Sequence, residues 1–185
     1  MRIRKQLTLG VALVTVLLVG CVTRSKYNTM LTQQQSIESA LRSEVSSQQV
    51  EIEQLEDGIR VNMSGALLYG EGAFELTPAG IAALNKVAPQ FASETYEIDV
   101  VGNTDNLPIG RGLEKRFPTN WELAGERASI VVRHLQSQGV DPTRMRAISA
   151  GEYHPRASND TAEGRARNRR TTILLRPRAK PASSS

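Results

Sequence analysis

The sequence predicts an α+β domain with the element order β-α-β-α-β-β, preceded by a helical spacer. Three observations support this fold class. Short runs alternate apolar and polar residues, capping signals start two helices, and a Gln- and Ser-rich stretch lacks Pro and Gly until Gly58. The 185 residues allow one domain of ordinary size with appendages, and an aromatic content of 4% predicts a core of aliphatic side chains.

The first strand is predicted over residues 59–63, where Ile, Val and Met alternate with polar residues, with residues 67–69 as its continuation. The first helix begins at Thr77 and Pro78, because Thr is a good N-cap and Pro fits the first helical position. Pro89 ends or kinks this helix, because it cannot donate a backbone hydrogen bond.

The stretch from residue 96 to 127 organises the domain. Residues 96–101 alternate as a half-buried strand and lead into the polar turn Gly-Asn-Thr-Asp-Asn at 102–106. The second helix begins after a long loop, at the capping box Thr-x-x-Glu of residues 119–122. An acid after a strand and Arg127 near a helix start can face each other across a cleft. Such a site suits a small zwitterion.

The second helix is predicted to stop at Gly139, with Val140 making the hydrophobic contact of a Schellman motif. Residues 145–150 read as the third strand and residues 170–176 as the fourth, separated by a polar loop over 151–164.

The N-terminus is predicted to be an export signal. Residues 1–5 are positively charged, and the apolar run 7–19 is too short for a comfortable membrane span. Leu-Val-Gly-Cys at 18–21 resembles the lipobox of bacterial lipoproteins, which implies lipidation of Cys21 and attachment to a membrane. A plain signal peptide or short anchor with an incidental Cys is the alternative. Val22 stands where the inner-membrane retention signal would be Asp, so the expected location is the periplasmic face of the outer membrane.

Residues 24–57 are predicted to form a solvated helix with an imperfect heptad repeat. Its predicted seam has Leu31, Val45, Ile52 and Ile59 at the a positions and Tyr27, Leu41 and Leu55 at the d positions. Either this helix self-associates as a coiled coil through residues 27–57, giving a homo-oligomer, or it is a lone tether. Fully helical, it would span roughly 50 Å.

Composition argues against several function classes. Removing the three basic residues of the predicted signal leaves 20 basic against 19 acidic residues, so net charge gives no support to a nucleic-acid partner. A single Cys and two His are too few to predict a zinc site, and no metal or cofactor is expected. The sequence contains no recognisable nucleophile–base pair or close carboxylate pair, so no catalytic residues are assigned and the protein is not expected to be an enzyme.

Three ordered motifs resemble one known family. They are residues 102–106, residues 120–128 (Asn-Trp-Glu-Leu-Ala-Gly-Glu-Arg-Ala) and residues 159–170. Together they are similar to the OmpA-like peptidoglycan-binding domain of OmpA-type porins, the lipoprotein Pal and the flagellar stator subunit MotB. The resemblance covers roughly residues 58–177. It implies a two-layer βαβαββ sandwich with the helices on one face of a mixed sheet.

The expected domain organisation has four parts. They are a signal peptide (1–20), the lipidated Cys with the helical spacer (21–57), the OmpA-like domain (58–177) and a disordered tail (178–185).

The resemblance also implies a binding site for the free amino-acid end of diaminopimelate in the peptidoglycan stem peptide. The family's acid and arginine correspond to Asp105, which can pair with the ammonium, and Arg127, which can grip the carboxylate bidentately. The other implied positions are Thr104, Asn120, Arg169 and Asn103, the last of which is often His in the family. The competing interpretation is a structural ion pair between Asp105 and Arg127. Trp121 either packs at the helix start or offers an aromatic platform to a sugar.

The expected function is that of a non-enzymatic outer-membrane lipoprotein, held in the membrane by its lipid and bound to peptidoglycan. The alternative is an envelope protein–protein interaction or regulatory module in a signalling, motor or secretion assembly, in which wall binding is secondary. In that case the long loop 107–118 or the coiled coil would contact an envelope protein partner.

Replacing Cys21 with Ser tests the lipid anchor. The variant should lose lipid labelling and leave the membrane fraction, because several buried acyl chains at about 0.8 kcal/mol per methylene supply the attachment. The measurement is fractionation of cells together with metabolic labelling by a fatty acid. A variant that is labelled and sediments like the wild type would contradict the lipobox assignment.

Overall fold

The computed structural model describes residues 24, 27–70, 72–92 and 95–178. The predicted signal peptide, Cys21 and the tail from residue 179 onward lie outside these residues, so their assignments stay predictions. Across the described ranges, no helix combines the length and the apolar character needed to cross a bilayer.

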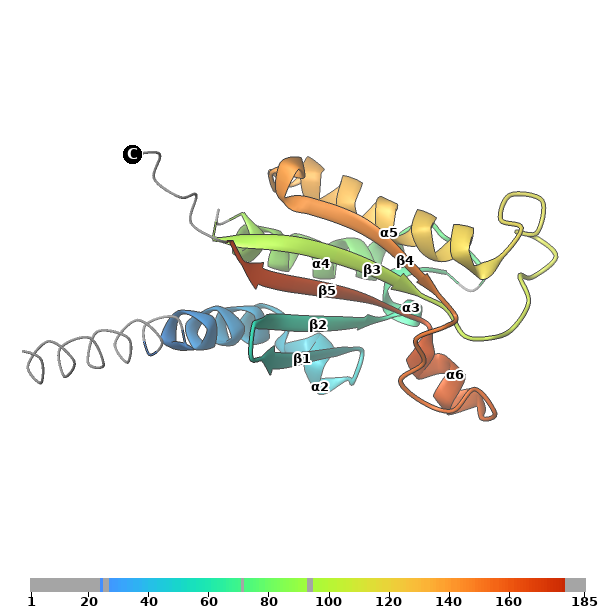
Figure 1. The fold of residues 1–185 in the computed structure, drawn as a ribbon, viewed down its shortest axis with the longest axis horizontal. Helices are drawn as coiled ribbons and strands as arrows, with labels where there is room; N and C mark the ends of the chain where they lie inside the picture. Colours follow the sequence, from blue (N-terminus) through green and yellow to red (C-terminus); the bar gives the residue numbers. More distant parts are fainter. Residues whose placement is uncertain (1–23, 25–26, 71, 93–94, 179–185) are drawn as a thin grey trace, which may run out of the picture.

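A five-stranded mixed sheet forms the centre of the domain, in the order β1-β2-β5-β3-β4 (Figure 1). The strands are β1 (Val50–Leu55), β2 (Gly58–Ser64), β3 (Tyr96–Asn103), β4 (Met145–Gly151) and β5 (Arg170–Pro177). Only β3 and β4 pair in parallel, and the other neighbours are antiparallel. The parallel pair follows from the long helix that joins these two strands.

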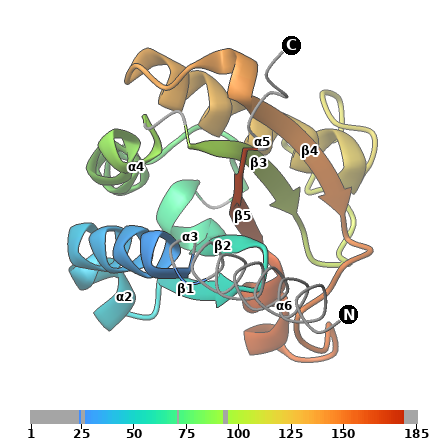
Figure 2. The same cartoon turned by 60° about the vertical axis from the view of Figure 1, so that its left-hand side comes forward.

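The long helices cover one face of this sheet, and the opposite face is uncovered (Figures 1 and 2). The helices are an N-terminal one over 27–40, α2 (Arg42–Ser46), α3 (Gly65–Leu68), α4 (Pro78–Phe91), α5 (Asn120–Ser137) and α6 (Ala162–Asn168). Apolar residues of the N-terminal helix, α4, α5 and the covered sheet face form one continuous core. The predicted α+β fold, with helices on one side of a mixed sheet, is therefore confirmed.

The capping predictions for α5 are also confirmed. Thr119 and Glu122 form the reciprocal capping box at its start. At its end, Gly139 adopts a φ of 91°, and the N–H of Val140 donates to the carbonyl of Leu135 at 3.1 Å. This is the 6→1 bond of a Schellman motif. Both ends of the helix are thus fixed by local sequence.

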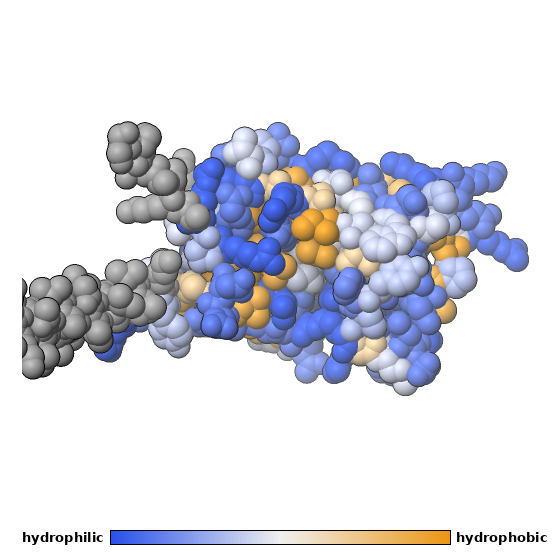
Figure 3. Space-filling model, in the orientation of Figure 1, coloured by the Kyte–Doolittle hydropathy of each residue, from blue (hydrophilic) through white to orange (hydrophobic). Residues whose placement is uncertain are grey.

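Charged side chains cover the face of the sheet that lacks helices, which Figure 3 shows as mostly hydrophilic with small apolar spots. Asp99 of β3 lies at the centre of this arrangement. Its carboxylate accepts from Arg146 of β4 at 2.6 Å and from Arg176 of β5 at 2.8 Å, so cross-strand ion pairs tie three strands together.

The prediction of helix through residue 57 is wrong over residues 50–55, which form strand β1. β1 pairs along its whole length with β2, from Val50 opposite Met63 to Leu55 opposite Gly58. The heptad assignment of Ile52 and Leu55 therefore fails. Alternation of Val50 and Ile52 with glutamates is a strand period, and tertiary pairing with β2 decides in its favour.

The helix before β1 is docked on the domain. Ile37 and Leu41 are fully buried in the core, and Gln33 donates to the carbonyl of Gln90 in α4 at 2.8 Å. Lys86 of α4 forms an ion pair with Glu44 at 2.6 Å. Because Leu41 packs against its own domain, this position of the predicted seam is not available to a second chain, whereas Tyr27 and Val45 are exposed. Self-association through this region stays a prediction.

Smaller differences concern local segments. Residues 67–68 belong to the short helix α3 and do not continue the first strand. Helix α4 runs through Pro89 to Phe91, and α6 occupies the end of the region predicted as a polar loop. Arg178, predicted to begin the disordered tail, donates its N–H to the carbonyl of Thr95 at 2.8 Å.

Replacing Ile37 or Leu41 with Ala tests the docking of the N-terminal helix. Each variant should lose about 2 to 5 kcal/mol of unfolding free energy, because each removes a fully buried side chain from the core. Urea denaturation measures the loss. Val45→Ala, an exposed position on the following helix α2, should stay within about 0.5 kcal/mol of the wild type. Equal stability of all three variants would show that the helix is not part of the domain.

Candidate functional site

A pocket of about 860 Å³ lies where β3 ends and α5 begins. Its wall also includes α3, the loop that follows it, and the region where α6 meets β5. Five of the predicted ligand-binding residues line it, namely Thr104, Asp105, Asn120, Arg127 and Arg169. The structure therefore brings together residues that are up to 65 positions apart in the sequence.

Asp105 is held in place by its own turn and by an arginine. Its Oδ1 accepts the backbone N–H of Leu107 at 3.2 Å, which is an Asx-turn. Its Oδ2 accepts from Nη1 of Arg169 at 2.6 Å, and only 9% of the Asp105 side chain is exposed. Thr104 fixes the preceding backbone by donating its N–H to the carbonyl of Gly151 at 2.9 Å. The carboxylate is thus oriented before any ligand arrives.

Arg127 enters the pocket from α5 and is buried. Its Nη2 donates to the carbonyl of Ala73 at 2.6 Å, and its guanidinium lies 4.9 Å from the ring centre of Tyr69. Burial lowers the pKa of Arg127, although an arginine stays protonated at any physiological pH. Burial also raises the pKa of Tyr69 to about 12, so its hydroxyl remains neutral and can donate. The charge of Arg127 is therefore supported by an aromatic face and a carbonyl.

Asp105 and Arg127 do not neutralise each other. Within the described part of the chain, the ion pair of Asp105 is made with Arg169, and no pair within 4.0 Å joins it to Arg127. The interpretation of these two residues as a structural ion pair is therefore wrong. Asp105 still acts on Arg127 through space, because its charge raises the pKa of that guanidinium and opposes the effect of burial.

The pocket retains hydrogen-bonding capacity and positive charge. The Nε of Arg127 and the Oγ1 of Thr104 are buried and have no partner among the residues that the structure describes. Leaving such groups unpaired costs about 1 to 3 kcal/mol each. The described lining residues include three arginines (Arg111, Arg127, Arg169) and one acid, Asp105. This arrangement suits a ligand with one ammonium group and more than one carboxylate.

Two predicted residues have other roles in the structure. Asn120 lines the pocket, but its Nδ2 donates to the carbonyl of Leu107 at 3.0 Å and to Oε2 of Glu152 at 2.5 Å, so it holds the pocket wall. Asn103 is buried in β3, where its side chain donates to the carbonyl of Val101 at 3.2 Å. Asn103 is not among the lining residues, and a direct ligand contact from it is not supported.

The long loop after Asp105 forms one side of the pocket. Residues 107–113 contribute to the lining. Phe117 is buried and packs edge-on against Phe74, with the ring centres 5.2 Å apart, and Arg116 lies 4.1 Å from the ring centre of Phe74. The loop is therefore fastened to the segment after α3. Tyr69 and Ala73, which contact Arg127, carry no local sequence signal for this role.

Close contact between β3 and α5 sets the geometry of the pocket. A Cβ atom at Gly102 would lie 2.0 Å from the carbonyl oxygen of Ala124, so no side chain fits there. Asp105 follows Gly102 by three residues, and Arg127 follows Ala124 by nearly one helical turn. The contact therefore places the acid and the arginine on facing elements.

The described residues contain no cluster of three or more His, Cys, Asp or Glu side chains that could hold a metal ion. The chemistry available at the pocket is ionic and hydrogen-bonding recognition by Asp105, Arg127 and Arg169.

Comparison with known proteins places these features in a family. The sequence model of the OmpA family matches residues 68–169, which is more than half of the chain. The probable lipoprotein YiaD of Escherichia coli is 35% identical over 141 residues, which cover 76% of this chain and 61% of that protein. The chain spans about half to three fifths of the length of the curated relatives that it matches first.

Solved structures share the fold, and two of them illustrate the likeness. A putative MotB-like protein from Desulfovibrio vulgaris has a TM-score of 0.76 and 25% identity, covering 85% of this chain and 99% of that one. The cell wall anchor of the T6SS from Pseudomonas aeruginosa has a TM-score of 0.70 and 29% identity, covering 77% and 97%.

Replacing Gly102 with Ala tests the contact that shapes the pocket. The added methyl group meets backbone atoms of α5, which cannot rotate away, so we expect a loss of at least about 3 kcal/mol of unfolding free energy in urea. Gly125→Ala is the control, because its Cβ would make an ordinary contact of 3.6 Å and Ala favours a helix. The assignment is wrong if Gly102→Ala is as stable as the control.

Proposed function

Because the chain belongs to the OmpA family, we propose that its domain binds peptidoglycan non-covalently and holds the free amino-acid end of diaminopimelate in the pocket. The observation that carries this proposal is a single cavity that contains a fixed carboxylate, Asp105, and a guanidinium, Arg127, that is held separately from it. The end of diaminopimelate carries an ammonium and a carboxylate on one carbon. Neutral sugars and alanine side chains offer neither charge.

The roles of the charged residues follow from their contacts. Asp105 is oriented by Leu107 and Arg169 and receives the ligand ammonium. Arg127 has five N–H donors, and its bond to Ala73 leaves donors for the ligand carboxylate. Arg169 has a side chain that is 43% exposed, so it can hold Asp105 and contact a further carboxylate of the stem peptide.

The mycobacterial relative ArfA is named a peptidoglycan-binding protein, and membership of the OmpA family confirms the expectation that this protein is non-enzymatic. The proposed function is therefore binding of peptidoglycan, with no reaction after it. Its strength depends on desolvated charge pairs, because these are the strong hydrogen bonds available to the pocket.

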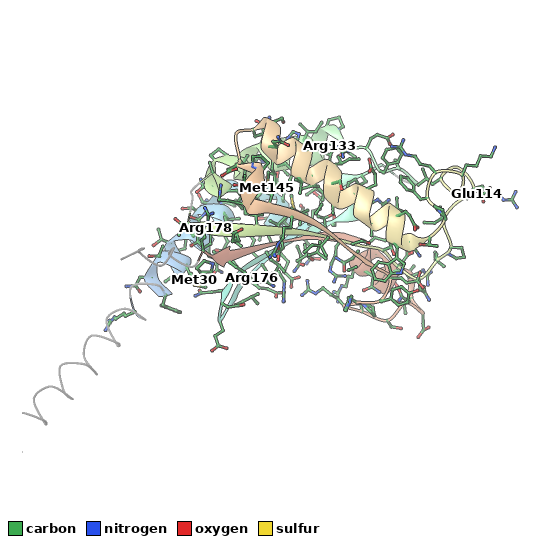
Figure 4. The ribbon with its side chains drawn as sticks, turned by 45° about the horizontal axis from the view of Figure 1, so that its top comes forward. Met30, Glu114, Arg133, Met145, Arg176 and Arg178 are labelled. Atoms are coloured by element: carbon green, nitrogen blue, oxygen red, sulfur yellow. The ribbon has the colours of Figure 1, made fainter. Side chains whose placement is uncertain are left out.

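At the level of the whole protein, we propose a lipid-anchored tether on the periplasmic face of the outer membrane, with Cys21 as the lipidation site. The name of the lipoprotein YiaD and that of the cell wall anchor from Pseudomonas support the two halves of this role. The arrangement of the domain supports it too. Met30 of the N-terminal helix and Glu114 of the pocket loop lie at opposite ends of the molecule (Figure 4).

Substituting Asp105→Asn and Arg127→Lys tests the site. Asn keeps the size of Asp but cannot neutralise an ammonium, and Lys keeps the charge of Arg but loses its bidentate fork. Each change should weaken binding to insoluble peptidoglycan roughly 10- to 100-fold, because each weakens a hydrogen bond to a charged group. Co-sedimentation at increasing protein concentration measures the effect.

The matched control is Arg133→Ala, an exposed arginine on α5 outside the pocket, which should bind like the wild type. Free diaminopimelate should compete for binding, whereas Nα-acetyl-lysine amide, which has a side-chain ammonium but no carboxylate on the same carbon, should compete poorly. Thermal melts establish that the variants are folded. Folded Asp105 and Arg127 variants that sediment like the wild type would refute the assignment.

A further inference from the structure

Trp121 and Tyr153 form a stacked aromatic pair on the surface beside the pocket. Their ring centres are 5.1 Å apart and their planes are inclined by 24°. Trp121 is 45% exposed and Tyr153 is 61% exposed. Two large rings stacked on each other in solvent are not explained by core packing, which buries its aromatic residues.

The local backbone is shaped to allow this stack. Gly151 has a φ of 54°, and a Cβ atom there would lie 3.3 Å from the Trp121 ring and 3.5 Å from the Tyr153 ring. The hydroxyl of Ser149 donates to the carbonyl of Trp121 at 2.7 Å and ties the end of β4 to the start of α5. The pair is therefore positioned by a rigid strand end and a capped helix start.

The pair is joined to the pocket at two points. Asn120, which lines the pocket, donates to Glu152 at 2.5 Å, and Thr104, which also lines it, donates to the carbonyl of Gly151 at 2.9 Å. Trp121 follows Asn120 directly, and Tyr153 follows Glu152. The Cα atoms of Trp121 and Tyr153 therefore lie about 3.8 Å from the Cα atoms of neighbouring residues that make these hydrogen bonds.

We propose that the Trp121–Tyr153 pair is a second subsite, which binds a pyranose ring of the glycan strand while the pocket holds the stem peptide. This inference rests on the proposed function and names a second part of the same ligand. In peptidoglycan the stem peptide hangs from an amino sugar. Three residues of extended peptide reach roughly 10 Å, which suits a sugar held just outside a pocket that holds the third residue.

The chemistry of the surroundings favours a sugar over an apolar protein segment. The C–H face of a pyranose packs on an aromatic ring, and its hydroxyl groups need polar partners at the edge. The carboxylate of Glu152 has four lone-pair sites, so its bond to Asn120 leaves acceptors for hydroxyl groups beside Tyr153. Glu122, the other acidic neighbour of Trp121, is exposed. An apolar partner would have to desolvate both acids.

The test compares three ligands on the full chain: the stem tripeptide alone, the same tripeptide on its disaccharide, and glycan strands stripped of peptide. Wild-type protein should bind the disaccharide–tripeptide about five- to tenfold more tightly than the tripeptide, the range expected for one aromatic stacking contact. In Tyr153→Ala and Trp121→Ala the ratio of the affinity for the disaccharide–tripeptide to the affinity for the tripeptide should fall to about one. The affinity for the tripeptide itself should stay the same. Trp121→Phe should keep most of the ratio.

The control is Tyr27→Ala, which removes an equally exposed tyrosine from the N-terminal helix and should leave the ratio unchanged. Trp121 is the only tryptophan of the chain, so its fluorescence reports the subsite directly. The sugar-bearing ligand should change this emission, and the tripeptide alone should leave it nearly constant.

Three results would overturn the proposal. They are a ratio near one for the wild type, equal loss of both ligands in Tyr153→Ala, and a fluorescence change that the tripeptide alone reproduces. If the tripeptide fails to bind any variant but stripped glycan binds through Tyr153, the proposed function fails and the sugar subsite stands. A protein partner that crosslinks at Trp121 while no sugar ligand binds would also overturn the subsite.

Discussion

The pocket depends on one backbone contact, between the end of β3 and the first turns of α5. At Gly102 the strand lies against the carbonyl of Ala124, and a methyl group at this position would overlap that oxygen. Residues three apart on a helix share a face, so the contact at Ala124 also fixes where Arg127 points. On the strand side of the contact, Asp105 lies three residues beyond Gly102. The opposite charges of Asp105 and Arg127 are therefore held on facing elements without forming an ion pair.

The sequence predicted the parts of this site that local signals control, because the capping box, the polar turn and the motif spacing all lie within short segments. The partner of Asp105 was not predictable in this way. Arg169 is 64 residues away, and only the antiparallel pairing of β3 with β5 brings it near. Asn103 shows the reverse error. It lies within a matching motif, yet the strand continues through it and keeps its side chain out of the pocket.

The predicted end of the helical spacer was wrong for a related reason. Residues 50–55 support both a heptad and a period of two, and helix propensity alone cannot separate them. The decision comes from β2, which offers β1 a complete row of backbone partners after the tight Glu56–Asp57 turn. Burial of Ile37 and Leu41 then turns the preceding helix into part of the domain. Long-range pairing outweighs a short local pattern here.

The N-terminal helix lies toward one end of the sheet, and the end of β3 and the start of α5, which border the pocket, lie toward the other (Figure 1). This placement has a mechanical consequence. The strands run from one end to the other, and their hydrogen bonds lie across that direction. Tension between a ligand in the pocket and the N-terminal helix therefore loads the ladders in shear, and many bonds must yield together. A geometry that pulled across the strands would open them one bond at a time. The domain is oriented to resist a sustained pull along its long axis.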